Sequence, residues 1–478
     1  MSQTPERNDV SNRQRGLCAF SVTTALLLAA CGGGGNNSAD DSSVVTTGGG
    51  TTAPAAETTP TSDDVTVVSS GDTTASAEPA AAGWAVDTSA CADPERAEQP
   101  IEGTVTIGAA VPLSGGPAAA FGPVKDGLQL YLDTASAQGL LPGYMLSADI
   151  RDDQYDATQT PGVVDGLIDD GVDFFSGIIG SPNNLAVRDT LNPECIPQLL
   201  ALTGSPAWGE VADYPWTTGA LVPYDIEAAV YATKLNELKP GAKVAVYYIN
   251  NEFGKAYIDE FKKQADELGF EIIDEQTVEP DVNDPPVTQV GSIAGNVPDA
   301  IIAVPLGLQC PAFLGELANA EAQSAGWAPL VFVTNTCASK LFFGLAGAAA
   351  EGVYTSNHLV DSNDPKNAEH PGVKSFLAAY TAAGLAGDPG VTEAGWTVGE
   401  TTVAILNAAL ETGTLSRKSI IEAARNLTFV PSLAREGIQY KMNGDADAYA
   451  FESLQVLQWS VASQTFTEIG APILEFES

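Results

Sequence analysis

Basic residues and histidine are scarce in this sequence. Lys and Arg number 21 against 61 Asp and Glu, and with only two His the formal net charge is −40 over 478 residues. A chain without a basic face cannot neutralise phosphates, which excludes nucleic acid as a partner. Aromatic residues make up only 7%, while 47 Gly and 30 Pro are typical of a globular protein with many turns. A coiled coil or a fibre is excluded by the same composition.

Catalytic motifs are also missing. The sequence contains no G-x-S-x-G elbow, no P-loop, no H-E-x-x-H and no dinucleotide glycine fingerprint ahead of a helix. His358 and His370 lie in a polar stretch with no evident catalytic nucleophile between them, so solvated roles are expected for both. An enzyme is therefore the less favoured class of protein, and neither a cofactor nor a metal is expected.

The N-terminus has the pattern of an exported lipoprotein. Three arginines precede an apolar run at 17–30, which ends in Leu-Ala-Ala directly before Cys31. The run is too short for a stable membrane span, and the small residues suit a signal peptidase. Residues 1–31 are thus predicted to be a lipoprotein signal peptide with a lipobox. Cys31 is the expected site of lipidation, and an ordinary signal peptide with a chance cysteine is the alternative.

A long polar stretch follows the signal peptide. Residues 32–83 contain no Leu, Ile, Phe, Tyr, Trp, Met, Lys or Arg. Such a composition offers too little apolar surface to form a core. Residues 32–100 are predicted to be a disordered acidic linker, rich in Gly, Ser, Thr, Ala and Pro, that tethers the folded body above the membrane.

Four cysteines lie beyond the signal peptide, namely Cys91, Cys195, Cys310 and Cys337. An even number in an exported protein predicts disulfides, and four cysteines allow three pairings. Cys310 with Cys337 is favoured because each directly follows a predicted strand, and neighbouring parallel strands lie about 4.8 Å apart. Cys91 with Cys195 follows by elimination, and the other pairings stay open. A structural zinc is disfavoured because no C-x-x-C pair exists.

The body of the chain alternates between apolar runs typical of strands and periodic stretches typical of helices. Strands are predicted at 104–111, 146–151, 172–179, 196–202, 243–249, 271–278, 300–304, 330–334 and 454–459. Helices are predicted at 125–138, 161–170, 185–191, 226–238, 255–268, 311–325 and 396–410. This alternation predicts parallel sheets covered by helices on both faces.

The body is too long for one such sheet, so two lobes are expected. The predicted fold class is α/β, with two doubly wound parallel-sheet lobes joined by hinge strands. Turn-rich stretches at 215–219 and 352–356 are the predicted crossings between lobes. Lobe 1 is assigned 101–219 plus 357–432, and lobe 2 is assigned 220–356 plus 433–478. Ligands bind beyond the carboxyl ends of strands in such sheets, so a site is expected in the cleft between the lobes.

An ordered series of motifs resembles the Leu/Ile/Val-binding family of type I periplasmic binding proteins. The likeness spans about residues 101–459, and it depends on the order of the motifs because none of them is specific alone. The matching motifs are TVTIGAAVPLS at 104–114 with Phe121 and Gly122 after it, RDD at 151–153, Ser181, TGS at 203–205, NNEFG at 250–254 and the strand at 454–459.

The resemblance implies a solute receptor outside the cytoplasm. Proteins of that family capture a small polar ligand, such as an amino acid, an amide or a related carboxylate, and deliver it to an ABC-type permease. The lipobox fits this role, with a monomer anchored by lipid to the outer face of the cell membrane. A membrane-tethered sensor or adhesion receptor without transport is the alternative, followed by an enzyme.

The expected ligand-binding residues follow the strand ends. Ser181 precedes Pro182 as a helix N-cap, and the resemblance assigns the matching serine to a ligand carboxylate. The family uses the corner at 202–205 for the ligand's carboxylate and ammonium, and aromatic residues matching Phe121 and Phe253 close over the ligand from opposite lobes. The full set of candidates is Phe121, Ser181, Leu202, Thr203, Gly204, Ser205, Phe253, Gln309, Asn335 and Thr336.

Three of these positions depart from the family's pattern. Amino-acid binders place a carboxylate for the ligand ammonium after the strand at 330–334, where this chain has Asn335 and Thr336. Where a tyrosine is usual, this chain has Gln309. A buried ammonium without a counter-charge is costly, which argues against an ordinary branched-chain amino acid. Glu393 and Glu400 are alternative sources of that charge, although solvated positions on the helix are expected for both.

Overall fold

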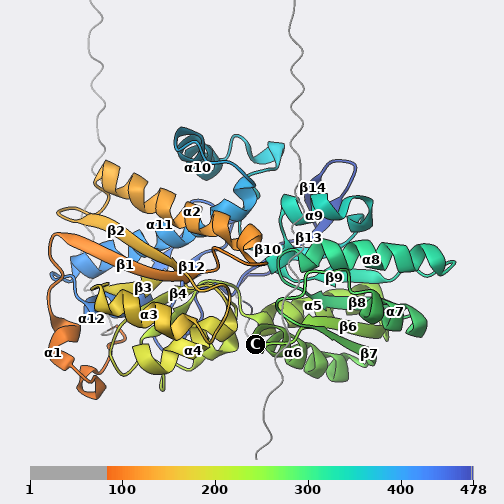
Figure 1. The fold of residues 1–478 in the computed structure, drawn as a ribbon, viewed down its shortest axis with the longest axis horizontal. Coiled ribbons are helices and arrows are strands. Elements are labelled where there is room, and N and C mark those ends of the chain that lie inside the picture. The colour runs from red at the N-terminus through yellow and green to blue at the C-terminus, as the bar shows by residue number, and fades with distance from the viewer. Residues whose placement is uncertain (1–82, 475, 477–478) are drawn as a thin grey trace, which may run out of the picture. The chain divides into compact units, whose positions relative to one another are not determined.

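The computed structural model describes residues 83–474 and residue 476, which form two lobes, each built on its own sheet (Figure 1). The predicted signal peptide, Cys31 and most of the predicted linker lie outside the described residues. The predicted α/β fold class with two parallel-sheet lobes is confirmed.

Lobe 1 contains a five-stranded sheet of order β2-β1-β3-β4-β5, in which every pairing is parallel. Its strands are β1 Thr104–Val111, β2 Met145–Asp152, β3 Phe174–Ser176, β4 Gln198–Ala201 and β5 Thr217–Gly219. Its main helices are α2 Ala118–Gln138, α3 Thr160–Asp169, α4 Ser181–Leu191, α11 Pro389–Glu411 and α12 Arg417–Arg425. Ala110 and Phe175 pack with α3 and α4, while the neighbouring Ala109 and Phe174 belong to the larger core. This alternation buries both faces of the sheet.

Helices α2 and α11 pack backbone against backbone. A Cβ atom on Gly127 would lie 2.0 Å from the Thr392 carbonyl oxygen, and one on Gly395 would lie 1.8 Å from the Val124 carbonyl oxygen. Only glycine permits so close an approach. The contact places the start of α11 beside the first half of α2, and both helices contribute to the cavity described below.

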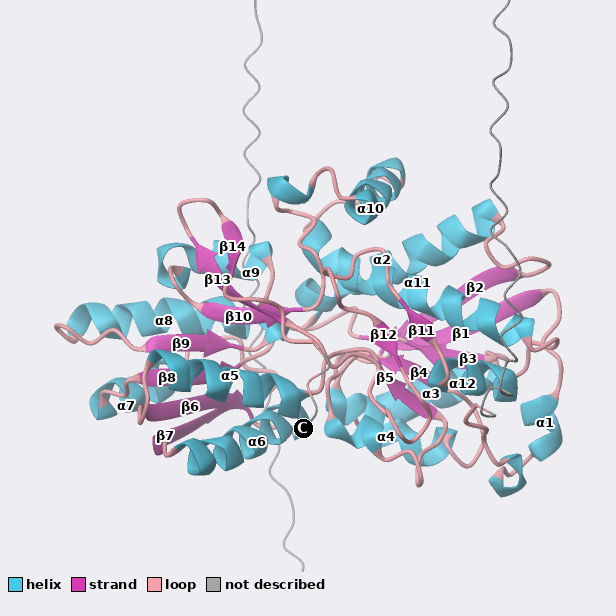
Figure 2. Cartoon of the chain, turned by 180° about the vertical axis from the view of Figure 1, so that it is seen from behind, coloured by secondary structure: helices cyan, strands magenta, loops and turns pink. Residues whose placement is uncertain are grey.

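Lobe 2 contains a seven-stranded mixed sheet of order β14-β13-β10-β9-β8-β6-β7 (Figure 2). β13 pairs antiparallel with both β10 and β14, and the other pairings are parallel. Its strands are β6 Lys243–Ile249, β7 Glu271–Val278, β8 Ala300–Val304, β9 Leu330–Val333, β10 Tyr354–Asn357, β13 Gln455–Ser460 and β14 Thr465–Glu468. Its helices are α5 Tyr224–Leu238, α6 Glu252–Leu268, α7 Val287–Asn296, α8 Gln309–Gln323 and α9 Lys340–Ala346.

Shorter elements complete the described chain. They are η1 Thr88–Ala90, α1 Pro94–Glu98, η2 Pro206–Gly209, η3 Asn335–Cys337, η4 Gly347–Ala350, η5 Pro365–Asn367, α10 Pro371–Ala382, and the paired strands β11 Thr428–Phe429 and β12 Tyr440–Lys441.

The predicted crossings between lobes need two corrections. The stretches at 215–219 and 352–356 contain β5 and most of β10, so they are largely strands and the chain changes lobe just after each. The last crossing was predicted after 432, but the Tyr440 hydroxyl donates to the Ala424 carbonyl and the Tyr449 hydroxyl to the Pro206 carbonyl. The chain therefore stays with lobe 1 to about residue 450, because the buried Tyr440 and the half-buried Tyr449 anchor it there.

The cysteines are joined in the pairs that the sequence favoured. Cys91 is bonded to Cys195, with Cα atoms 5.5 Å apart, and Cys310 to Cys337, with Cα atoms 5.8 Å apart. Both disulfides lie within a lobe, and the second lies beside the cavity.

The predicted linker ends earlier than residue 100. Residues 83–100 include η1 and α1, and Trp84 and Asn426 exchange two hydrogen bonds of 2.8 Å. The prediction of disorder is therefore wrong for this part. Trp84 and the buried Val86 supply the apolar surface that residues 32–83 lack, and the Cys91 disulfide fixes the segment to lobe 1.

Candidate ligand-binding site between the lobes

A cavity of about 140 Å³ lies between the lobes. Lobe 1 contributes α2 and α11, and lobe 2 contributes the first turns of α5 and α6 with the loops that follow β8 and β9. Most of its wall is apolar, and an apolar cavity of about 150 Å³ is large enough to hold benzene. The largest apolar side chains on the wall are Phe121, Val124, Leu202, Phe253, Leu306 and Phe342.

Two pairs of aromatic rings face the cavity. Phe253 packs against Tyr224 with ring centroids 4.7 Å apart, and Phe121 stacks on Tyr155 with centroids 6.0 Å apart. The structure thus brings both predicted aromatic residues to one cavity, from α6 and α2. Sequence reasoning missed the two tyrosines, because nothing in the local pattern separates them from core tyrosines.

Tyr224 occupies the polar corner that was predicted to hold the ligand. The Ser181 hydroxyl lies 2.5 Å from the Thr203 hydroxyl, and a Cβ atom on Gly204 would lie only 2.8 Å from the Tyr224 ring. Burial raises the pKa of the Tyr224 phenol, and hydrogen bonds from Thr203, from the Gly204 backbone and from Ser181 lower it. Ser181, Thr203 and Gly204 therefore contact Tyr224 instead of the cavity, and none of these three predicted site residues lines it.

Local structure explains what Ser205 and Gln309 do, and it corrects the predicted N-cap role of Ser181. Ser181 is the first residue of α4, and Gly180, with a φ of 100°, is the N-cap instead. Ser205 caps η2 by accepting from the Ala207 N–H at 3.3 Å. The Gln309 amide donates to the carbonyl oxygens of Glu279 and Val282 at 3.0 and 2.8 Å. Ser205 and Gln309 thus hold backbone in place and lie outside the cavity wall.

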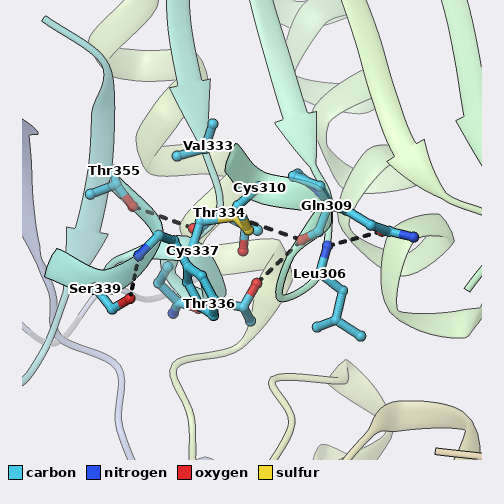
Figure 3. Close-up of a disulfide and its surroundings, with 12 residues drawn as sticks. Leu306, Gln309, Cys310, Val333, Thr334, Thr336, Cys337, Ser339 and Thr355 are labelled. Carbon is cyan, nitrogen blue, oxygen red and sulfur yellow. Dashed lines mark hydrogen bonds between the residues drawn. A yellow bond between two sulfur atoms is a disulfide. The ribbon is translucent and has the colours of Figure 1, made fainter. Parts of the chain in front are cut away.

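The loop after β9 brings Asn335 and Thr336 to the cavity. Figure 3 shows how the loop is held: Cys337 is bonded to Cys310 at the start of α8, and Ser339 caps α9. The Asn335 N–H donates to a Glu227 carboxyl oxygen at 2.8 Å. The loop is therefore attached to two helices of lobe 2, one covalently and one through a buried acid.

Glu227 is fully buried on α5 and accepts four hydrogen bonds. Besides the Asn335 N–H, its donors are the hydroxyls of Tyr231 at 2.8 Å, Ser356 at 2.6 Å and Thr334 at 3.2 Å. Burial raises the pKa of Glu227 to about 7, and the hydrogen bonds from these donors offset only part of that rise. The group joins α5 to the ends of β9 and β10 directly behind the cavity loop.

Two titratable groups that were expected to be solvated also line the cavity. Glu393 is 2% exposed and His358 is 7% exposed, so the prediction was wrong for both. Burial and the nearby Asp361 raise the pKa of Glu393 well above its ordinary value. Burial, followed by the charge of Arg435, lowers the pKa of His358 to about 4. A sequence signal did exist for Glu393, which lies between Val391 and Trp396 in a helix with long apolar stretches.

Glu400 lies two turns further along α11, away from the cavity wall. It is half-buried and accepts hydrogen bonds from the backbone N–H and the hydroxyl of Ser432, at 2.9 and 2.8 Å. Its expected solvation is likewise wrong, since burial raises the pKa of Glu400 as well.

None of the helices in the described part of the chain has the length and apolar character needed to cross a lipid bilayer. The same residues contain no group of three or more His, Cys, Asp or Glu arranged to hold a metal ion.

Two α/β lobes with a ligand-sized cavity between them define the class of two-lobed binding proteins. The family model of the periplasmic binding proteins matches residues 104–462, and the chain belongs to this family of extracytoplasmic substrate-binding proteins. The family predicted from the sequence is thus confirmed.

The similar proteins support the same assignment. The "Leu/Ile/Val-binding protein homolog 2" of Brucella abortus (strain 2308) is 26% identical over 167 residues, which are 34% of this chain and 44% of the relative. The matched region thus spans less than half the length of that curated relative.

Solved structures share the fold. A branched-chain amino acid ABC transporter protein from Thermus thermophilus with bound valine has a TM-score of 0.70 at 18% identity, over 78% of this chain and 97% of its own. A fatty acid ABC transporter substrate-binding protein from Thermomonospora curvata has a TM-score of 0.66 at 19% identity, over 79% and 95%. At such identities these matches show the fold and not the ligand.

Proposed function

We propose that this chain captures a small, largely apolar molecule in the cavity between its lobes and delivers it to an ABC-type permease. The main support for this proposal is the wall of that cavity, which is formed mostly by apolar and aromatic side chains from both lobes. Burying such a molecule removes apolar surface from water on both partners, which is the main source of affinity in pockets of this kind.

The site favours such a molecule over an α-amino acid. Ser181, Thr203 and Gly204 would have to meet the ligand carboxylate, but Tyr224 takes their place at the cavity wall. Asn335 stands where an amino-acid binder has its acid, so that position provides no counter-charge for an ammonium. The solved relatives named for valine and for fatty acid both bind molecules with an aliphatic part, which is consistent with an apolar wall.

Ligand capture is proposed to close the lobes about the three segments that connect them, with the protein acting as a monomer. Export and lipidation at Cys31, outside the described residues, would place the receptor on the outer face of the cell membrane. Mass spectrometry of the membrane fraction tests the anchor, and a mature N-terminus other than acylated Cys31 would contradict it. A tethered sensor without transport uses the same cavity, and transport measured after deletion of a candidate permease separates the two.

Calorimetry with hexanoate, benzyl alcohol, benzylamine and valine tests the cavity. Phe253→Ala removes a ring from the wall and should weaken binding of the probe that binds best by about tenfold or more. Phe313→Ala is the matched control, because Phe313 is a buried ring of lobe 2 that stacks on Tyr247 away from the cavity. Equal affinity in wild type and Phe253→Ala, or tight binding of valine alone, would contradict an apolar ligand.

A further inference from the structure

We propose that the molecule bound in this cavity carries a cationic head group, an ammonium on an apolar body, and that Glu393 is its counter-ion. The inference rests on the proposed function, because it names the ligand class for the same cavity. It concerns a residue of lobe 1 that lies on a different element from the corner where the sequence predicted polar recognition.

Glu393 is a buried acid without an ion-pair partner. It is 2% exposed in the first turns of α11, and its carboxyl group accepts a hydrogen bond from the Ser362 N–H at 3.0 Å. No Lys, Arg or His forms an ion pair with it within residues 83–474. A buried carboxyl group that faces a ligand cavity without such a partner is suited to pair with a charge that the ligand brings.

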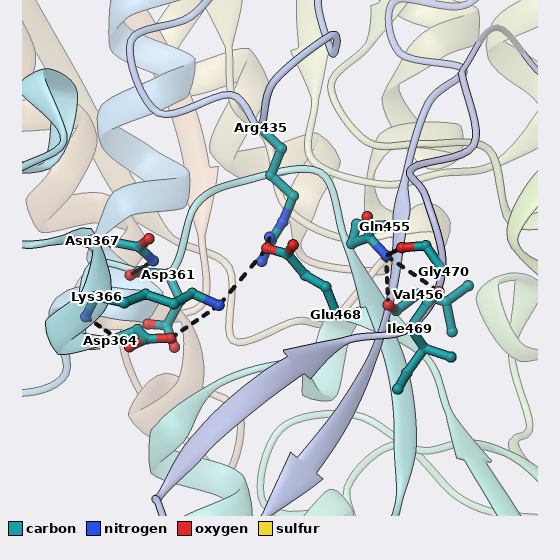
Figure 4. Close-up of polar contacts among 10 residues, drawn as sticks. All are labelled: Asp361, Asp364, Lys366, Asn367, Arg435, Gln455, Val456, Glu468, Ile469 and Gly470. Carbon is teal, nitrogen blue, oxygen red and sulfur yellow. Dashed lines mark hydrogen bonds and ion pairs between the residues drawn. The ribbon is translucent and has the colours of Figure 1, made fainter.

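The surrounding charges favour a cation over an anion. Asp361 and Asp388 both add negative charge near Glu393. Arg435 is the nearby base, and its charge interacts with Glu393 and Asp361, but its guanidinium forms its ion pair with Glu468 of β14 at 2.7 Å, as Figure 4 shows. Neither Lys nor Arg lines the cavity formed by the described residues, so a bound carboxylate would find no counter-charge there. Burial and Asp361 raise the pKa of Glu393, which favours the neutral carboxyl group over the carboxylate until a cation binds.

A second observation points to a ligand in the same cavity. His358 lines the cavity, and its buried Nδ1 atom has no hydrogen-bond partner within the described structure. Since burial and then the charge of Arg435 lower the pKa of this imidazole to about 4, the ring is neutral near pH 7 and one of its nitrogens is able to accept an N–H from an ammonium.

The aromatic part of the wall supports the same ligand class. Rings of Phe121, Tyr155, Tyr224, Phe253 and Phe342 line the cavity, and the negative faces of aromatic rings attract ammonium groups. An anion gains nothing from these faces. An aryl or alkyl ammonium thus matches the apolar wall with its body and the acidic end with its head.

Proton release distinguishes this binding mode. When an ammonium binds, Glu393 loses one proton to solvent and the resulting carboxylate pairs with the ligand cation. A neutral ligand leaves the proton in place. Affinity for an ammonium should therefore rise with pH up to the pKa of Glu393, while affinity for a neutral ligand of the same shape should not.

Three probes with one body test the head group: benzylamine as its ammonium ion, benzyl alcohol and benzoate. Calorimetry in two buffers of different protonation enthalpy should show that benzylammonium binds about tenfold or more tighter than benzyl alcohol, with proton release. Benzoate should bind weakest. The wild-type proton count needs no variant and so does not depend on how a mutant folds.

Two variants on α11 test whether Glu393 causes the preference for benzylammonium and the proton release. Glu393→Gln keeps an acceptor for Ser362 and should remove both the preference for benzylammonium and the proton release. Glu400→Gln is the matched control, because Glu400 lies on the same helix and bonds to Ser432 outside the cavity wall, so both properties should persist. Thermal unfolding of each variant checks that it is folded.

The outcomes separate the two proposals. If benzyl alcohol or benzoate binds as tightly as benzylammonium and no proton is released, the cationic head group is refuted and the apolar-ligand function stands. The same conclusion follows if Glu400→Gln and Glu393→Gln behave alike. If neither these probes nor hexanoate binds, the proposed function and the inference both fail.

Discussion

Glu227→Gln should change how the stability of lobe 2 depends on pH. The Glu227 carboxyl group is fully buried and accepts hydrogen bonds from Tyr231, Ser356, Thr334 and the Asn335 N–H. Glutamine retains one oxygen for the donors that converge on Oε1, and the Thr334 hydroxyl can turn to accept from the new amide. The substitution therefore removes an ionisation while it preserves most of the network.

The magnitude follows from linkage. Burial raises the pKa of Glu227 to about 7, compared with 4.5 in the unfolded chain. Below the unfolded pKa the group is protonated in both states and folding carries no penalty. Between the two pKa values the unfolded chain ionises while the buried acid keeps its proton, so by the time the pH has risen through the folded pKa the wild type has lost about 3 kcal/mol of stability, at 1.36 kcal/mol per pKa unit. The tyrosines that face Glu227, which are Tyr231, Tyr257 and Tyr224, stay neutral across this range because burial raises the pKa of each.

Urea unfolding followed by tryptophan fluorescence between pH 4 and 8 measures the effect. The stability of wild type minus that of Glu227→Gln should fall by about 3 kcal/mol across this range, and most of the fall should lie between pH 5 and 7. Glu237→Gln, an exposed acid on the same helix that pairs with Lys234, controls for general charge effects. Parallel profiles for wild type and Glu227→Gln would refute the reasoning, because they would mean that Glu227 ionises as easily in the folded protein as in the unfolded chain.

Two further predictions follow from contacts near the cavity. Ser181→Ala leaves the buried Thr203 hydroxyl without its 2.5 Å partner, so it should lower the free energy of unfolding by about 1 to 3 kcal/mol. The affinity for benzylammonium should stay unchanged. A tenfold weaker affinity measured by calorimetry would instead place the ligand head group at Ser181. Replacing Cys310 and Cys337 with serine opens a loop with a sequence separation of 27, so it should destabilise the protein by about 3 to 4 kcal/mol and weaken probe binding. An unfolding midpoint and an affinity equal to those of wild type would show that the disulfide does not hold the Asn335 loop.

The repeating part of the fold was predictable because its physical signal is local. Apolar runs such as 243–249 and 300–304 are buried on both faces of a sheet, and the structure has strands with these same bounds. Two short strands were missed because their local signal is weak. β5 and β10 have only three and four residues in turn-rich surroundings, and their identity depends on pairing with strands that are distant in the sequence. α12 was missed although its amphipathic pattern is a local signal.

The candidate site was predictable by element and not by side chain. The strand-end loops do converge on a cavity, and Phe121, Leu202, Phe253, Asn335 and Thr336 line it. Ser181, Thr203 and Gly204 lie behind it instead, because a residue from the other lobe fills the space in front of them. No pattern within residues 181–205 contains that information, since it comes from the position of α5 after the first crossing.

One turn of α5 decides the character of the cavity on both sides. Tyr224 and Glu227 are three residues apart, so their side chains share a face of the helix. Tyr224 reaches the polar corner of lobe 1, and Glu227 holds the backbone of the cavity loop in lobe 2. The ring that fills the polar corner and the acid that positions Asn335 are therefore fixed by the same helix. Since Tyr224 and Glu227 both make their polar contacts inside the protein, Glu393 and the His358 Nδ1 atom, which has no partner in the described structure, are the groups of the cavity wall that we propose for a ligand.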